Sequence, residues 1–145
     1  MAKKPSRKYL VKKLDSLFSI YIRLKSADKN QIVKCYTCNT KKHYKDYMQC
    51  GHFISRRHYV TRWLETNAKP QCYSCNVGNQ GMQYQFAINL NKEYGYDIAQ
   101  ELLQKSKETV KFSNDDLISL INRYKEFIDL MNTVSYTHLR AHETS

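Results

Sequence analysis

The chain has 145 residues, a length that suits one domain with a modest hydrophobic core. No apolar run approaches the roughly 20 residues that span a bilayer, and the first residues lack the apolar segment of a signal peptide. These features argue against a membrane-spanning protein, and we expect a cytoplasmic protein without a membrane partner.

The net charge of +11 is concentrated in one part of the chain. Residues 1–90 carry 17 Lys or Arg and 4 Asp or Glu, whereas residues 91–145 carry 7 and 9. A basic field of this kind attracts polyanions, and nucleic acid is the first candidate. Solubility or an acidic protein partner would account for the same charge, so this alternative stays open.

Residues 1–30 are predicted to form a basic N-terminal arm and a helix. Between about Arg7 and Ala27, apolar residues recur at spacings of four and three, which places them on one helical face. Lys8, Lys12 and Lys13 occupy other faces, where they either contact a phosphate backbone or form a solvated surface. The apolar stripe consists of Leu10, Leu14, Leu17, Tyr21 and Leu24.

Residues 31–95 hold the chemically unusual part of the chain. Cys35 and Cys38 form one Cys-x-x-Cys pair, and Cys72 and Cys75 form another. Each pair lets two thiolates reach one ion from a tight turn, and two pairs complete the four-sulfur shell that suits zinc. Neither pair lies in the βαβ pattern of a thioredoxin-like redox site, so we expect a structural Zn²⁺.

Short strands are expected between the two cysteine pairs. Ile32–Tyr36 suggests a strand that enters the first pair, and Lys41–Met48 is expected to return as its partner. Phe53 and Ile54 are expected to begin the next extended segment, which would display His52. Taken alone, a histidine at this place is better explained as a structural ligand or a surface residue.

The segment from Arg56 to Arg62 is both basic and aromatic. Arg56, Arg57 and Arg62 are therefore candidates for contacts with nucleic acid, because guanidinium groups pair well with phosphate oxygens. An ordinary exposed basic loop is the alternative interpretation.

Helices are predicted for the rest of the chain. The first covers residues 76–94 with Gly95 as its C-terminal cap, and the next runs from Asp97 to about residue 107. Residues 96–133 are expected to pack against the metal-binding part as a support.

The last helix is predicted to begin at residues 113–116, which form a capping-box pattern, and to end near Asn132. Residues 134–145 lose the apolar period and resemble a translated sequencing adapter, so we interpret them as a non-native or disordered tail. His138 and His142 lie in this tail and are given no function.

Together these residues resemble the HNH, or ββα-metal, nuclease superfamily. In that superfamily a Cys-x-x-Cys pair precedes a strand with the catalytic histidine, and an asparagine precedes a second pair that opens a helix. The matching positions here are Cys35/Cys38, His52, Asn67, Cys72/Cys75 and Asn76. More narrowly, the runs that begin at Cys50-Gly-His-Phe and at Trp63-Leu-Glu-Thr resemble the NinG (Rap) family of phage recombination proteins, over about residues 5–110.

The resemblance implies an α+β fold, in which a small ββα-metal, HNH-like zinc domain is flanked by N- and C-terminal helices. It implies a metal-dependent DNA endonuclease that cuts branched DNA such as Holliday junctions, D-loops or flaps. His52 would be the general base, Asn67 would hold the loop, and Asn76 would bind a catalytic Mg²⁺ or Mn²⁺. The implied partners are DNA, phage or host recombination proteins and a second copy of the chain, in the cytoplasm of a bacterial host.

The sequence departs from the superfamily pattern beside His52. Many relatives place a metal-binding Asp or His directly before the base, whereas this chain has Gly51. Cys50 is either a thiolate ligand or a buried small hydrophobe, and His58 and Asp46 are further candidate ligands. Two non-enzymatic alternatives remain open: a zinc-containing nucleic-acid-binding module and a zinc module that binds proteins.

Overall fold

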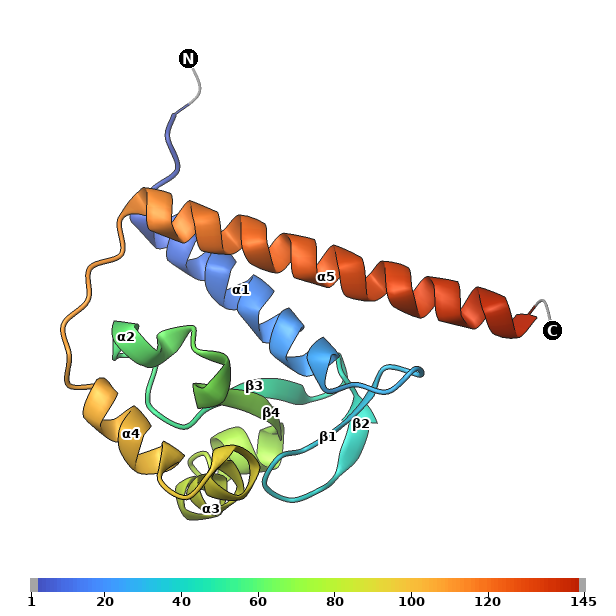
Figure 1. Cartoon of the computed structure of the whole chain (residues 1–145), viewed down its shortest axis with the longest axis horizontal. Helices are drawn as coiled ribbons and strands as arrows, with labels where there is room; N and C mark the ends of the chain where they lie inside the picture. Colours follow the sequence, from blue (N-terminus) through green and yellow to red (C-terminus); the bar gives the residue numbers. More distant parts are fainter. Residues whose placement is uncertain (1–2, 144–145) are drawn as a thin grey trace.

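The computed structural model describes the backbone of residues 3–143 and the side chains of residues 3–133. Helices α1 (Arg7–Lys25) and α5 (Asn114–Glu143) lie side by side and run in the same direction (Figure 1). One small sheet packs against another side of α1, and residues near the end of α1 pack against a strand of a second small sheet. Helix α1 is thus the middle layer between α5 and the part of the chain that carries the cysteines.

Helix α1 begins where the Ser6 hydroxyl accepts a hydrogen bond from the backbone N–H of Tyr9. The expected stripe is confirmed in part, because Leu17 and Leu24 are only partly buried while Phe18 and Ile22 are buried. The reason is that α1 has packing partners on two sides, so its buried face is wider than the stripe of a helix that covers one layer.

Helix α5 begins with the expected capping box. The Ser113 N–H donates to Asp116 Oδ2 at 2.9 Å, and the Asp116 N–H donates to Ser113 Oγ at 3.0 Å. The helix continues to Glu143, past the expected end near Asn132. The interpretation of residues 134–145 as a non-native tail stays a prediction, since residues 144–145 and all side chains of this segment lie outside the described part.

The strands form two separate antiparallel pairs. Strand β1 (Ile32–Lys34) pairs with β2 (Lys41–His43), and β3 (Met48–His52) pairs with β4 (Ala68–Cys72). The predicted strand Lys41–Met48 is therefore wrong in extent, because it ends at His43 and Met48 opens β3. His52 is the last residue of β3 rather than the residue before a strand. The strand does not continue because the Asn67 side chain forms hydrogen bonds with both the N–H and the carbonyl of Ile54.

The predicted helix over residues 76–94 is interrupted. A single π-helical turn, η2 (Ser74–Gly78), follows β4, and helix α3 (Gln83–Tyr94) starts separately. Between them Gly81 has a φ of +85° and Met82 has a φ of +50°, which no right-handed helix accommodates. Gly95 closes α3 as expected, with a φ of +122° and its N–H donating to the Asn91 carbonyl.

Three short elements complete the described fold. Helix α2 (Tyr59–Arg62) and the 3₁₀ turn η1 (Glu65–Asn67) connect β3 to β4, and α4 (Ile98–Lys105) packs against α3. Within the residues that the structure describes, no helix combines the length and the apolar character that crossing a bilayer requires.

The contact between α1 and α5 should dominate the stability of the helical layer. Leu14→Ala removes a fully buried side chain of α1 and should lower the free energy of unfolding by about 3–5 kcal/mol, because a cavity remains. Leu130→Ala makes the same chemical change at a position of α5 that is 62% exposed and should stay within about 0.5 kcal/mol of the parent. Urea denaturation of zinc-loaded protein measures both, and equal losses would contradict the described packing.

Candidate active site and metal centre

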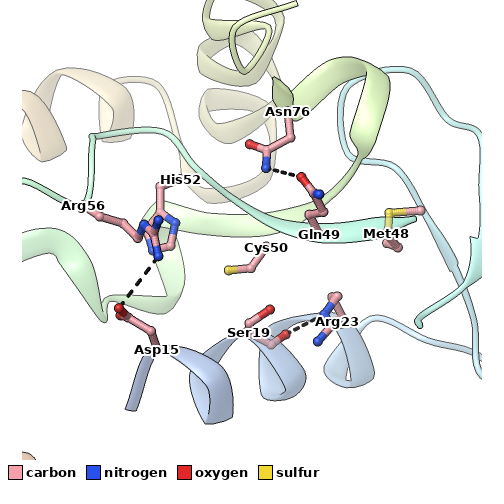
Figure 2. A pocket seen from close by; sticks show the side chains of 9 residues that line it. All are labelled: Asp15, Ser19, Arg23, Met48, Gln49, Cys50, His52, Arg56 and Asn76. Atoms are coloured by element: carbon pink, nitrogen blue, oxygen red, sulfur yellow. Dashed lines mark hydrogen bonds and ion pairs between the residues drawn. The ribbon is translucent and has the colours of Figure 1, made fainter. Parts of the chain in front are cut away.

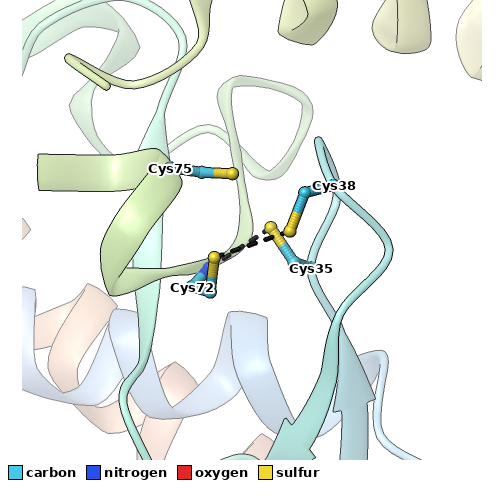
Figure 3. A group of neighbouring side chains, drawn as sticks. All are labelled: Cys35, Cys38, Cys72 and Cys75. Carbon is cyan, nitrogen blue, oxygen red and sulfur yellow. Dashed lines mark hydrogen bonds between the residues drawn. The ribbon is translucent and has the colours of Figure 1, made fainter. Parts of the chain in front are cut away.

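The four paired cysteines converge on one point (Figure 3). The sulfur atoms of Cys35, Cys38, Cys72 and Cys75 all lie within 4.8 Å of one another, and those of Cys38 and Cys72 are 3.6 Å apart. A tetrahedral zinc with Zn–S bonds of about 2.3 Å requires sulfur separations of about 3.8 Å. The cluster therefore has the ligands and the spacing to hold a metal ion such as zinc.

Hydrogen bonds from both cysteine turns favour the thiolate form of Cys35. Burial raises the pKa of Cys35, but backbone N–H groups of Cys72, Thr37 and Cys38 donate to its sulfur and bring the pKa down to about 6. Burial raises the pKa of Cys75 to about 12 in the metal-free cluster. A bound cation reverses this effect, because coordination requires and stabilises the thiolate.

A buried glutamine links the two cysteine turns and explains Gly51. The Gln71 amide nitrogen donates to Thr37 Oγ1 at 3.1 Å and to the Gly81 carbonyl at 2.9 Å, one partner beside each cysteine pair. A Cβ on Gly51 would lie 1.8 Å from Gln71 Oε1. Position 51 therefore has no room for a metal-binding Asp or His while Gln71 keeps this place.

A cavity of about 530 Å³ opens beside β3, between α1 and η2 (Figure 2). His52 and Asn76, two of the three predicted catalytic residues, both line it. The remaining lining residues are Asp15, Ser19, Arg23, Met48, Gln49, Cys50 and Arg56. Because α1 supplies Asp15, Ser19 and Arg23, the cavity includes a wall that the cysteine motifs do not indicate.

His52 is held in one tautomer. Its Nε2 lies 3.0 Å from the carbonyl oxygen of Arg62, which can only accept a hydrogen bond, so Nε2 carries the proton. In the neutral ring Nδ1 is then unprotonated, and the described residues provide it with no hydrogen-bond partner. Burial lowers the pKa of His52, Arg56 and Arg62 lower it further, and the carbonyl contact and Asp15 oppose this effect. The ring is neutral at pH 7 and can accept a proton at Nδ1.

Asn67, the third predicted catalytic residue, lies in the interior instead of the cavity. Its side chain accepts a hydrogen bond from the Ile54 N–H at 2.8 Å and donates to the carbonyls of Ile54 and Thr61 at 3.1 and 3.0 Å. These bonds fix the loop that joins His52 to the carbonyl it contacts. Asn67 therefore holds this loop, and its predicted part in catalysis stays a prediction.

Asp15 organises one end of the cavity and was not singled out from the sequence. Its carboxylate accepts hydrogen bonds from Arg62 Nε at 3.1 Å, Arg62 Nη2 at 2.5 Å and Trp63 Nε1 at 3.0 Å. The one available signal was that Asp15 is the only acidic residue of α1. The prediction that Arg62 contacts nucleic acid is not supported, since its guanidinium is largely covered and committed to Asp15.

The cavity fits a protein-bound Mg²⁺ or Mn²⁺ poorly. Asp15 is its only carboxylate, and both oxygens are engaged by Arg62 and Trp63. The Asn76 amide nitrogen donates to Gln49 Oε1 at 2.7 Å, so only the neutral amide oxygen of Asn76 is left as a candidate ligand. Burial raises the pKa of Cys50 to about 12, so this residue stays a thiol. Mg²⁺ is usually bound through one or two carboxylates together with waters and substrate phosphates, and the described residues of this cavity offer it no unpaired carboxylate.

Of the other predicted residues, Arg56 lines the cavity, while Arg57, Lys8, Lys12 and Lys13 do not. Arg57, Lys8 and Lys12 are exposed and free to meet a polyanion, and Lys13 is partly exposed with its ammonium 5.9 Å from the Tyr9 ring centre. Arg56 is 60% exposed and lies 3.7 Å from Asp15. The candidate ligands His58 and Asp46 are not among the residues that line the cavity.

Comparison with protein families adds an independent observation. The family model described as the bacteriophage lambda NinG protein matches residues 1–133. The chain belongs to the NinG family. The match covers α1, both cysteine pairs and the residues of the His52 cavity, and it ends directly before the predicted tail. Neither a search of curated proteins nor a search of solved structures gave a significant match.

Removal of one cluster cysteine should cost the metal and the fold together. Cys72→Ser should reduce the zinc content from one equivalent per chain to near zero, because three thiolates do not complete the four-ligand coordination of a structural zinc. Elemental analysis measures this content. Loss of a structural zinc removes much of a small domain's folding free energy, so the melting temperature should fall sharply. Cys50→Ser is the matched control and should keep its zinc. A Cys72→Ser protein with full zinc content would contradict the four-cysteine site.

Proposed function

We propose that this NinG family member is a DNA endonuclease that hydrolyses phosphodiester bonds in the His52 cavity. The observation that carries the proposal is the hydrogen bond from His52 Nε2 to the Arg62 carbonyl. It leaves Nδ1 of a neutral imidazole as the acceptor of a proton in a space lined by arginines. A histidine base beside fixed positive charges matches the needs of phosphate hydrolysis.

The proposed reaction is a single displacement at phosphorus. His52 Nδ1 takes a proton from a water molecule, and the water oxygen forms the new bond to phosphorus as the bond to the 3′ oxygen breaks. The leaving 3′ oxygen takes a proton from solvent, so the products are a 5′ phosphate and a 3′ hydroxyl. Arg56 lies beside this space, where its charge offsets the charge that develops on the phosphate oxygens.

The choice of substrate rests on family membership and charge. The sequence resemblance to phage recombination proteins favours branched DNA such as four-way junctions, D-loops or flaps. The excess of lysine and arginine over residues 1–90 supports binding to any nucleic acid backbone. A homodimer, with phage or host recombination proteins as further partners in the bacterial cytoplasm, remains part of this proposal because branched junctions have two-fold character.

A non-catalytic nucleic-acid-binding module is the second candidate. It is favoured by the poor fit of the cavity to a protein-bound cation, since Asp15 is fully engaged. Under this alternative His52 stabilises the loop, and the basic surface alone binds the nucleic acid. The requirement for Mg²⁺ or Mn²⁺ is therefore an open prediction, which is tested by omitting each cation.

Cleavage of labelled DNA separates the two candidates. Purified protein should cut a four-way junction or a flap faster than linear duplex, and His52→Ala should lower the rate by about 10²–10⁴-fold with zinc content retained. His58→Ala removes a histidine of the same loop that does not line the cavity and should leave the rate unchanged. Reactions with Mg²⁺, with Mn²⁺ and with neither cation run beside each variant.

Tight binding without cutting by folded, zinc-loaded protein would reject the nuclease and support the binding module. Equal cutting by the parent and His52→Ala would reject His52 as the base. Neither binding nor cutting would favour a module that interacts with proteins.

The acid limb of the pH profile should report His52. Because burial and nearby arginines hold the pKa of His52 below its ordinary 6.5, the neutral base persists to lower pH and the rate should fall only below pH 6.5. Arg56→Gln removes a charge that disfavours the imidazolium, so the acid limb should move to higher pH. Single-turnover rates between pH 4.5 and 8 measure the shift, with Arg57→Gln as the control that should not move it.

A further inference from the structure

Arg23 is a fixed guanidinium on α1 that lines the cavity at the end away from Arg56 (Figure 2). Its Nε donates to the Ser19 carbonyl at 3.1 Å, and its Nη1 donates to the Tyr44 carbonyl at 2.6 Å. The central carbon of the guanidinium also lies 5.6 Å from the centre of the Tyr44 ring. Three contacts therefore set the position of the group before any ligand arrives.

The remaining edge of this guanidinium has no anion beside it. None of the ion pairs within the described residues includes Arg23, and Nη2 has no hydrogen-bond partner there. Burial is the main cause of its lowered pKa, which expresses the cost of keeping a partly buried cation without a counter-charge. Arg62, by contrast, lies against the carboxylate of Asp15.

The surroundings of Arg23 favour an anionic ligand over a cationic one. Cys50, which lies between Arg23 and Arg56 in the close view, is a neutral thiol, and Gln49 and Asn76 are bonded to each other. The only carboxylate of the cavity is paired with Arg62. A space of about 530 Å³ that is lined by Arg23 and Arg56, and to which the described residues contribute no free carboxylate, suits a phosphate group.

We propose that Arg23 is a phosphate-binding residue of this cavity, whose free Nη2 edge donates to a non-bridging oxygen of the DNA phosphodiester. The catalytic part of this proposal rests on the proposed function, because it places the bound phosphate in the cavity that His52 lines. The binding part does not depend on cleavage. Arg23 and Arg56 would then supply the positive charge that offsets the charge of the phosphate. The cavity residues themselves are poor ligands for a metal cation that could do the same.

The salt dependence of DNA binding tests Arg23 without any need for turnover. Zinc-loaded parent protein, Arg23→Gln, Arg23→Lys and Arg123→Gln are titrated against a dye-labelled four-way junction between 50 and 200 mM KCl with no added divalent cation. Arg23→Gln should bind about tenfold more weakly, and the slope of log Kd against log salt should fall by about 0.9, which corresponds to one lost phosphate contact. Arg123→Gln makes the same charge change on an exposed part of α5 and should keep the slope.

Arg23→Lys protects the test against misfolding. It keeps the positive charge, so its slope should match the parent although its affinity falls. Zinc content and the far-ultraviolet circular dichroism of each variant establish the fold. A purely structural role, through the Tyr44 carbonyl, would lower the melting temperature of Arg23→Gln and leave the slope unchanged.

The outcomes for binding and for cleavage are separate. An unchanged slope and affinity in folded Arg23→Gln would overturn the inference even if the parent protein cuts DNA. A reduced slope together with a parent protein that cuts nothing would support the phosphate site and reject the nuclease. No binding of the junction by the parent at 50 mM KCl would overturn both.

Discussion

Four cysteine sulfurs within 4.8 Å of one another are the constraint on which the rest of the structure depends. Four thiolates at such distances repel one another, so a bound cation is needed to hold them together. The cation then cross-links two segments that are distant in the sequence. The cluster fixes the end of β4 and the start of η2, and Gln71 ties both cysteine turns together. Asn76 directly follows Cys75 in the sequence, so the cysteine cluster also determines its position.

Helix α1 forms part of both the helical layer and the cavity wall, through different residues of the same helix. One side packs on α5 through Leu14 and Phe18, and another side lines the cavity through Asp15 and Arg23. A change in how α1 packs on α5 would therefore also change the position of Asp15 relative to Arg62. The stability of the helical layer and the geometry of the cavity are therefore coupled through one rigid element.

The sequence predicted the features that depend on local spacing. The cysteine pairs, the capping box at Ser113 and the cap at Gly95 follow from residue type and separation alone. It could not predict the partner of Arg62, because Asp15 lies 47 residues away and only the packing of α1 brings them together. The break before α3 was missed for a similar reason, since the left-handed backbone at Met82 depends on tertiary context.

The acceptor for His52 Nε2 is a main-chain carbonyl at the end of α2, one of the last carbonyls that a helix leaves without an internal partner. The group that selects the tautomer is therefore not encoded by a side chain. Any residue at position 62 that permits the same backbone conformation keeps this carbonyl acceptor. Alanine scanning along the loop would therefore not detect the group that sets the tautomer of His52. A change in backbone chemistry, such as an ester bond after residue 62, would weaken this acceptor while every side chain stayed in place.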